Sequence, residues 1–184
     1  QFPAKLVMQL GYTGSEAHRL TIQPNINQAL PGAGTVNSRR PYQGVGNINR
    51  YSPIVNSHYN AMISKLERRF SGGISLLASY TYGHSIDGGG NVNDKSDVAA
   101  QNVRNLSAEK ASSNFDIRHR LVLSGLYQLP FGKSKGPLSY LVRDWQLSGI
   151  FSTQTGKPFS ATLSTDPSNT GATARPNRLA AGNL

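Results

Sequence analysis

Cysteine is absent from this chain of 184 residues, and histidine occurs only four times. Without cysteine, neither a disulfide framework nor a thiolate site can be assigned. The histidines are scattered, none has a metal-ligand spacing such as HExxH, and no G-x-S-x-G serine elbow occurs. We therefore expect no catalytic residue, no metal site and no cofactor, and we predict that the chain is not an enzyme.

Long apolar runs are also missing. Hydrophobic residues make up 37% of the chain and the mean hydropathy is −0.40. No apolar run reaches the roughly 18 residues that a transmembrane helix needs. A membrane-spanning β-strand needs an apolar residue only at every second position, so low hydropathy leaves a β-barrel open.

Acidic residues are few: 9 Asp and Glu stand against 19 Lys and Arg, for a formal net charge of +10. Such a balance can indicate nucleic-acid binding, but it also suits a basic lumen or loop surface. The charges are spread along the chain and never form a run of five. We favour the second interpretation and do not expect a nucleic-acid partner.

The clearest pattern present is an alternating hairpin at 57–86, SHYNAMISKLERRFSGGISLLASYTYGHSI. Its second half carries apolar or aromatic residues at the even positions 74–82 and mostly small polar residues between them. In its first half Met62, Leu66 and Phe70 share one parity and charged residues the other, and a tight turn is expected at 71–73. Period-two alternation places one face against an apolar phase and the other against a wet one.

The rest of the chain repeats this pattern. We predict strands near residues 4–13, 58–70, 74–86, 115–129 and 145–163, with long loops at 14–56, 87–114 and 164–184. Glycine, proline and asparagine fill the long loops. The sequence therefore predicts an all-β fold, an antiparallel meander of about five or six long strands.

The aromatic residues sort by the rim of this sheet to which they lie nearest. Four lie beside the short connections and four beside the long loops: Phe2, Phe70, Tyr127 and Trp145, then Tyr12, Tyr80, Tyr82 and Phe115. Two aromatic girdles and unequal loop lengths are typical of an outer-membrane β-barrel. A soluble sandwich also alternates, but it needs no aromatic residues at both rims, so we favour the barrel.

Several segments resemble a known family. They are YNAMISKLERRFSGGISLLASYTYGHSID, NFDIRHRLVLSGLYQLPFGKSKG, WQLSGIFSTQTGKPFSATL and RPN at 175–177, with NINQALPG and RRPY before them. Together they resemble the barrel region of TonB-dependent outer-membrane receptors, most closely the Oar-like branch. The resemblance covers nearly the whole chain.

The resemblance implies a 22-stranded barrel with a plug, energised from the inner membrane through TonB. About five or six strands are expected here, so we expect a fragment of a longer parent chain. The implied partners are outer-membrane lipid and lipopolysaccharide, the remaining barrel and plug, the TonB complex through an N-terminal part not included here, and an imported ligand of unknown identity. The implied location is the outer membrane of a Gram-negative-type bacterium.

Strand parity and loop composition give two sets of candidate residues. Predicted to contact the lumen, plug or ligand are Lys65, Glu67, Arg69, Arg118, Arg120, Arg39, Arg40 and Tyr42. Predicted to face lipid are Leu6, Met8, Leu10, Leu76, Tyr80, Tyr82, Leu121, Leu123, Tyr127, Trp145, Leu147 and Phe151. A cation facing lipid near the midplane would cost roughly 2–4 kcal/mol. The strand charges could equally form an ion-pair network along the wall, which is the interpretation we favour.

Two loop patterns also have ordinary explanations. The first long loop interleaves arginine with tyrosine and could bind an anionic or sugar ligand, lipopolysaccharide phosphates or single-stranded nucleic acid, or only solvate the loop. The run from Asp87 to Asp97 is rich in oxygen donors but lacks the spacing of a calcium loop, so we expect a flexible turn. A basic β-rich nucleic-acid-binding or adhesive domain is the alternative to the receptor.

Overall fold

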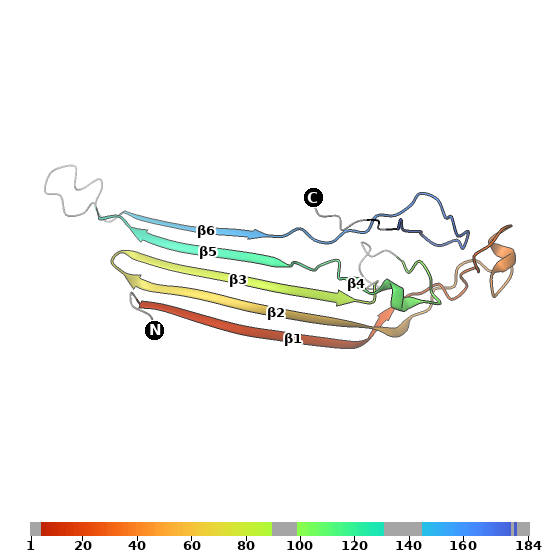
Figure 1. Cartoon of the computed structure of the whole chain (residues 1–184), viewed down its shortest axis with the longest axis horizontal. Helices are drawn as coiled ribbons and strands as arrows, with labels where there is room; N and C mark the ends of the chain where they lie inside the picture. Colours follow the sequence, from red (N-terminus) through yellow and green to blue (C-terminus); the bar gives the residue numbers. More distant parts are fainter. Residues whose placement is uncertain (1–4, 90–98, 131–144, 178, 180–184) are drawn as a thin grey trace. The chain divides into compact units, whose positions relative to one another are not determined.

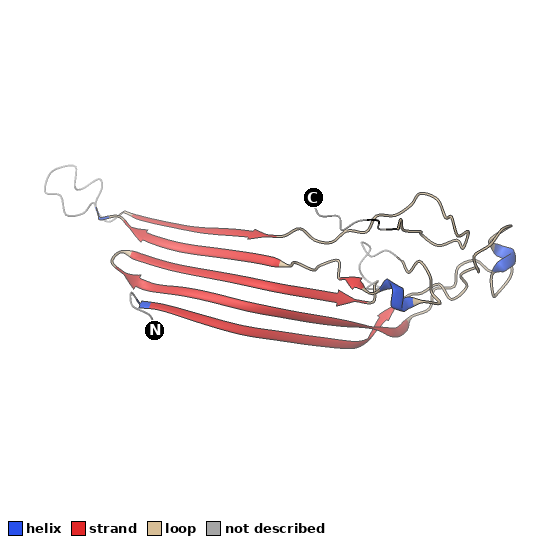
Figure 2. Cartoon of the chain, viewed as in Figure 1, coloured by secondary structure: helices blue, strands red, loops and turns tan. Residues whose placement is uncertain are grey.

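The computed structural model describes residues 5–89, 99–130, 145–177 and 179. Six strands form one sheet: β1 (Leu6–Ile22), β2 (Ser52–Ser71), β3 (Ile74–Asp87), β4 (Ala111–Ser112), β5 (His119–Gln128) and β6 (Gln146–Gln154). The five long strands lie side by side in sequence order, β1-β2-β3-β5-β6, and the short β4 pairs with β3 (Figures 1 and 2). The predicted all-β antiparallel meander is therefore confirmed. β1 and β6 form the two edges, and the described sheet is not closed.

Contacts within the chain group into two compact units. The sheet unit comprises residues 1–14, 59–84 and 117–156, and the loop unit comprises 15–58, 85–116 and 157–184. Five of the six buried apolar side chains among the described residues, Ile22, Pro24, Ala29, Val55 and Ala174, belong to the loop unit. The sixth, Ala61, belongs to the sheet unit, because within the described part of that unit no second layer packs on the sheet.

The register of β3, β5 and β6 follows one regular alternation. Ala78 pairs with Leu123, which pairs in turn with Phe151. Directly paired residues of an antiparallel sheet point to the same side. One face therefore carries Ile74, Leu76, Ala78, Tyr80 and Tyr82 together with Leu121, Leu123, Tyr127, Leu147 and Phe151.

The opposite face is more polar, although it is not free of apolar residues. It carries Ser75, Ser79 and Thr81 of β3, with Arg120, Ser124, Ser148 and Ser152 of the next two strands. Leu77, Val122, Leu126 and Ile150 stand among these polar residues, and Ile150 is 80% exposed. Exposure alone therefore does not tell the two faces apart.

A two-residue turn joins β2 to β3. Gly72 and Gly73 both have positive φ angles, +63° and +79°. That pair of angles is typical of a type I′ turn, the loop whose twist matches a right-handed hairpin. The turn lies within the predicted 71–73 segment. A Cβ at Gly73 would also lie 3.0 Å from the carbonyl oxygen of Gln128. Glycine at this position therefore suits both the positive φ angle and the close approach of β5.

The alternation of β2 is interrupted once. A two-residue loop sets Ser71 opposite Ile74, which would place Gly83 opposite Met62. A Cβ at Gly83 would instead lie 3.5 Å from the Cβ of Ala61. Because β3 pairs regularly with β5 from Ile74 to Tyr82, the extra residue belongs to β2, as a β-bulge between Ala61 and Ser71. The uniform alternation predicted for 58–70 is wrong on this point.

The predicted strand ends differ from those observed. β1 runs to Ile22 instead of residue 13, and β2 begins at Ser52, because the two strands continue to pair through sequence that is polar on both faces. β5 starts at His119, four residues later than predicted. There Asp116 accepts a hydrogen bond from the amide of Ser85 (2.8 Å), which binds the chain locally before the strand begins. β6 ends at Gln154, which pairs with Arg120, because its partner β5 begins at His119.

Candidate functional site: a loop unit with an open cavity

The first long loop is held by one buried asparagine. Asn27 has no exposed surface. Its side-chain amide donates to the carbonyls of Tyr42 (3.0 Å), Val45 (3.0 Å) and Gly46 (2.8 Å), and its side-chain oxygen accepts from the amide of Tyr42 (2.8 Å). A single side chain therefore satisfies the backbone of a segment that has no secondary structure, as buried backbone groups require.

Arg39 and Arg40, which were predicted to contact a ligand, donate hydrogen bonds that hold the loop segments together. Arg39 donates to the carbonyls of Leu30 (3.0 Å) and Gly34 (3.1 Å), and also to that of Asn169 in the third long loop. Arg40 donates to the carbonyl of Asn27 (2.8 Å). These guanidinium groups act as cross-links between loop segments. The ring of Tyr42, by contrast, is 58% exposed and remains available.

A glutamine joins the first loop to the second. Gln28 is 2% exposed. Its side-chain amide donates to the carbonyl of Gln101 (2.8 Å), and its oxygen accepts from the amide of Val103 (2.9 Å). Arg104 returns the contact by donating to the carbonyl of Gln28 (2.6 Å). Gln28 therefore pairs with the second loop much as a neighbouring strand would.

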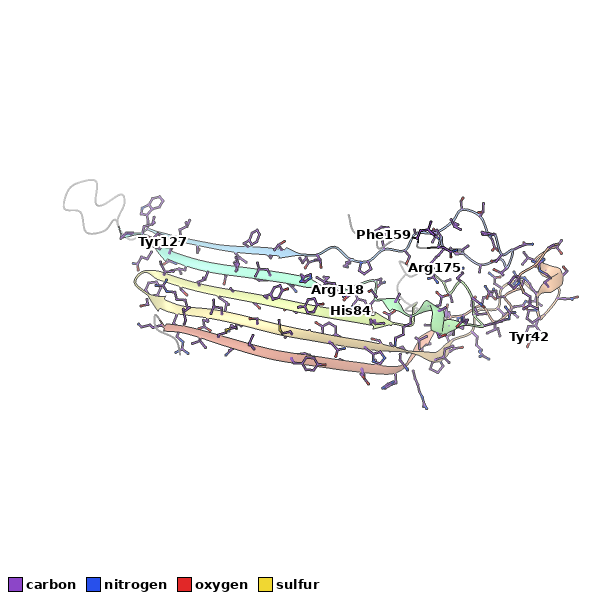
Figure 3. All side chains as sticks on the ribbon, viewed as in Figure 1. Tyr42, His84, Arg118, Tyr127, Phe159 and Arg175 are labelled. Atoms are coloured by element: carbon purple, nitrogen blue, oxygen red, sulfur yellow. The ribbon has the colours of Figure 1, made fainter. Side chains whose placement is uncertain are left out.

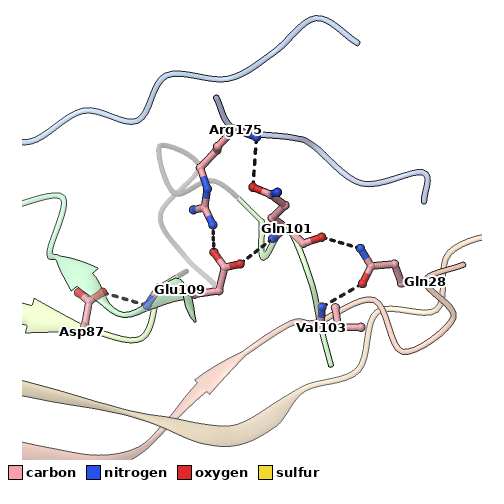
Figure 4. A network of polar contacts seen from close by, with 7 residues as sticks. Gln28, Asp87, Gln101, Val103, Glu109 and Arg175 are labelled. Atoms are coloured by element: carbon pink, nitrogen blue, oxygen red, sulfur yellow. Dashed lines mark hydrogen bonds and ion pairs between the residues drawn. The ribbon is translucent and has the colours of Figure 1, made fainter. Parts of the chain in front are cut away.

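A buried ion pair joins the second loop to the third. The Glu109 side chain is 5% exposed and forms an ion pair with Arg175. Glu109 also accepts from the amide of Gln101 (3.0 Å), whose side-chain oxygen accepts from the amide of Arg175 (3.2 Å). Figure 4 shows these residues linked to Gln28 in one polar network. Three loops far apart in the sequence are thereby fixed to each other.

A cavity of about 580 Å³ lies within this loop unit. Its apolar lining includes Ile22, Pro24, Phe115, Pro158 and Phe159. Its polar lining includes Asp87, Glu109, Ser112, Asn114, Lys157 and Arg175. The size falls within the range of small-molecule sites. Polar and apolar groups contribute about equally to the wall, which is more polar than is usual for such sites. Phe115 lines this cavity, and its place in an aromatic girdle stays a prediction.

The third loop has its own carboxylate anchor. Burial by itself would raise the pKa of Asp166, but hydrogen bonds from the Gly171 amide, the Ser168 hydroxyl and the Thr170 and Asn169 amides outweigh it. The pKa of Asp166 therefore lies below its ordinary value. Asp166 is ionised at neutral pH and keeps the turn at 166–171 closed.

The predicted lumen charges of β2 lie close together. Glu67 forms ion pairs with Lys65 (3.5 Å) and with Arg69 (3.9 Å), all three side chains being well exposed. Arg120 faces Thr81 and Gln154 on the more polar face. Arg118 lies just outside β5, and its guanidinium is 3.0 Å from Nε2 of His84 (Figure 3). Whether these groups face a lumen remains a prediction.

Aromatic and imidazole rings gather at the end of β3 that leads into the second long loop. The hydroxyl of Tyr80 lies 2.7 Å from Nδ1 of His119, and the rings of Tyr82 and His119 are 5.1 Å apart. On β1, Tyr12 donates a hydrogen bond to the side-chain oxygen of Asn60. The tyrosines of β1 and β3 thus have polar partners for their hydroxyls or rings, as suits a boundary between apolar and wet surroundings.

The remaining residues predicted to face lipid lie on long strands or beside them. Met8 and Leu10 of β1 are 51% and 67% exposed, and Leu6 is partly buried at the start of that strand. Trp145, one residue before β6, is 61% exposed, and Leu147 is 66% exposed. Phe2 lies outside the described residues. Large apolar side chains with this much exposure imply a surface that another phase covers.

Sequence reasoning missed the residues that tie the loops together: Gln28, Gln101, Glu109 and Arg175. Gln28 and Arg175 lie in segments that resemble the family, NINQALPG and RPN, but neither was expected to hold the loops. Glu109 and Arg175 are 66 positions apart. Within the described part of the chain no group of three or more His, Asp or Glu side chains could hold a metal ion. The oxygen-rich run at 87–97, for which we expect a flexible turn, lies partly outside the described residues. No described helix has the length and apolar character to cross a membrane.

The sheet unit is a meander of long amphipathic strands with a two-residue turn between β2 and β3, and the long connections make up the loop unit. Such a meander is typical of the wall of a β-barrel. The comparison with protein families agrees over the full length. The family model described as "Outer membrane beta barrel domain" matches residues 1–184, and the chain belongs to this family. No curated protein and no solved structure matches the chain. Membership places the protein in the outer membrane, as the sequence predicted.

Proposed function

We propose that this outer-membrane barrel domain is part of a TonB-dependent receptor or transporter of the Oar-like kind. Its strands form barrel wall, and its loop unit captures the ligand. The observation that carries the proposal is the loop unit: three long loops tied by buried polar contacts around a cavity of about 580 Å³. A passive pore has no need for a shaped cavity in its loops, whereas a receptor does.

The orientation of the sheet follows from the same proposal. The face with Leu76, Leu123 and Phe151 is turned to lipid, and the face with Ser79, Ser124 and Arg120 is turned to the lumen. Lipid accepts alternate apolar residues as long as all backbone groups are paired between strands. The proposal also places the Lys65–Glu67–Arg69 group on the inner wall, which requires the bulge of β2 to lie between Arg69 and Ser71. Partial exposure to water there limits the cost of the charges.

The test measures uptake in the native bacterium. A strain lacking this protein and a strain lacking the TonB complex are each supplied with a panel of single nutrients: an iron chelate, a vitamin, an oligosaccharide and a short peptide. We expect that uptake of one nutrient is lost in both strains. If uptake through this protein persists when the TonB complex is absent, the protein is a passive channel and the proposal is wrong.

A further inference from the structure

The walls of the loop-unit cavity combine buried apolar groups with uncovered aromatic rings. Ile22 and Pro24 are buried beneath it, while Phe115 is 58% exposed and Phe159 is 92% exposed. Exposed rings beside a cavity lose unfavourable water contact when an apolar group occupies the space. The occupant should therefore carry an apolar body, such as an aromatic or aliphatic side chain.

The charges of the cavity leave one cation and one anion without an ionic partner. Glu109 is neutralised by Arg175. Lys157 forms no ion pair with any described carboxylate, and Asp87 accepts a hydrogen bond from the amide of Gly89 (3.0 Å) but pairs with no described cation. Both line the same cavity, so the space offers an ammonium donor and a carboxylate acceptor to a single occupant.

From these two features we infer that the cavity binds a short peptide with free termini and an apolar side chain. The peptide carboxylate pairs with Lys157, its ammonium with Asp87, and its side chain lies against Phe115 and Phe159. A simple anion would leave Asp87 as a repelling charge, and a simple cation would meet Lys157. A neutral sugar would desolvate both charges without a countercharge, which costs free energy. The inference deepens the proposed function and rests on it.

The experiment is a calorimetric titration of the full-length protein, purified from outer membranes in detergent. The probe is L-phenylalanyl-L-alanine, compared with its N-acetyl derivative, its C-terminal amide and maltose. Hydrogen bonds to charged groups are worth about 1.5–3 kcal/mol, so each blocked terminus should weaken binding about 10- to 100-fold. Maltose should not bind.

Two variants assign the contacts. Asp87→Asn keeps the oxygen that accepts from Gly89, and Lys157→Met keeps most of the side-chain stem. We expect Asp87→Asn to bind the dipeptide and its N-acetyl derivative equally, while still discriminating against the amide. Lys157→Met should show the reverse. Lys65→Met, a change outside the cavity, should leave all affinities as they are.

Equal affinity for all three peptide forms, tighter binding of maltose, or no binding of the dipeptide would overturn the inference. Energised uptake of another nutrient without dipeptide binding would refute this site while leaving the receptor proposal intact. Dipeptide binding without TonB-dependent uptake would refute the receptor proposal and leave the site.

Discussion

At the scale of single residues, the loop unit depends on polar side chains that are buried and fully engaged. Asn27 and Gln28 are almost inaccessible, and Glu109 carries a charge in a side chain that is 5% exposed. Each holds segments that lie tens of positions away in the sequence. An unmatched buried polar group costs more than a made bond contributes, so the loss of any partner should loosen the cavity.

The Glu109–Arg175 pair gives the first prediction. Glu109→Gln keeps an acceptor for the Gln101 amide but leaves Arg175 without its countercharge. Breaking a buried pair costs about 3–5 kcal/mol, and less here because Arg175 is 28% exposed. We expect faster hydrogen exchange at the amides of Gln101 and Arg175. The exchange rate should rise about tenfold for each 1.4 kcal/mol by which the loop unit is destabilised.

The matched control lies in the exposed ion pairs of β2. Lys65→Gln removes a partner of Glu67 where both side chains are 39% exposed, so the effect should stay below about 1 kcal/mol. Similar changes in exchange for the two variants would show that Glu109 does not support the loops.

For the candidate site, the sequence offered only residue types and their spacing as a basis for prediction. Arg39, Arg40 and Tyr42 were predicted as ligand contacts from their types and proximity in sequence. The structure uses both arginines to bind carbonyls, one of them 130 positions away. Spacing in the sequence cannot reveal such partners, because they come together only when the three long loops fold against each other. The same reason hid Gln28, Gln101 and Arg175.

At the scale of elements, hairpin chemistry decides how the strands are joined. The Gly72–Gly73 turn has two positive φ angles and lies close to Gln128 of β5. A side chain at Gly72 would meet open space, whereas one at Gly73 would press on the Gln128 carbonyl. The two glycines are therefore not equivalent.

Gly73→Ala tests this difference. The left-handed backbone costs an L-residue about 1–2 kcal/mol, and the 3.0 Å approach to Gln128 adds to it. We expect a lower free energy of unfolding in urea for the protein refolded into lipid vesicles. Gly72→Asn is the control, because asparagine tolerates this conformation and Asn-Gly is a favoured type I′ pair. Equal losses in both variants would contradict the assigned turn.

Strands were predictable where alternation was strong and less so where it was weak. Period-two patterns identified β3 and the pairing faces of β5 and β6, since each residue step reverses the side chain. The predicted ends of β1, β5 and β6 were wrong because contacts with other segments decide them. β1 continues to pair with β2, the hydrogen bond between Asp116 and Ser85 precedes β5, and β6 ends where β5 begins. The bulge in β2 left no mark in the alternation and was not predicted.

For the whole molecule, the proposed barrel wall requires one face of the sheet to contact lipid and the other to contact water. One face gathers large apolar side chains with no protein layer over them in the described residues, and the family belongs to the outer membrane. The other face mixes serine and arginine with Leu77, Val122 and Ile150. The composition of the two faces therefore favours lipid contact for the face with the large apolar side chains.

The most direct test compares two neighbouring positions of β5. These 184 residues contain no cysteine, and any cysteine elsewhere in the full-length protein is replaced by serine. Single cysteines at Leu123 and Ser124 then carry spin labels, with the protein in lipid vesicles. Leu123 pairs with Ala78 and Phe151, and Ser124 pairs with Leu77 and Ile150 on the opposite face. We expect the label at 123 to collide mainly with dissolved oxygen, which concentrates in lipid, and the label at 124 with a water-soluble nickel chelate. The reversed result, or equal accessibility at both positions, would contradict the assignment of the apolar face to lipid.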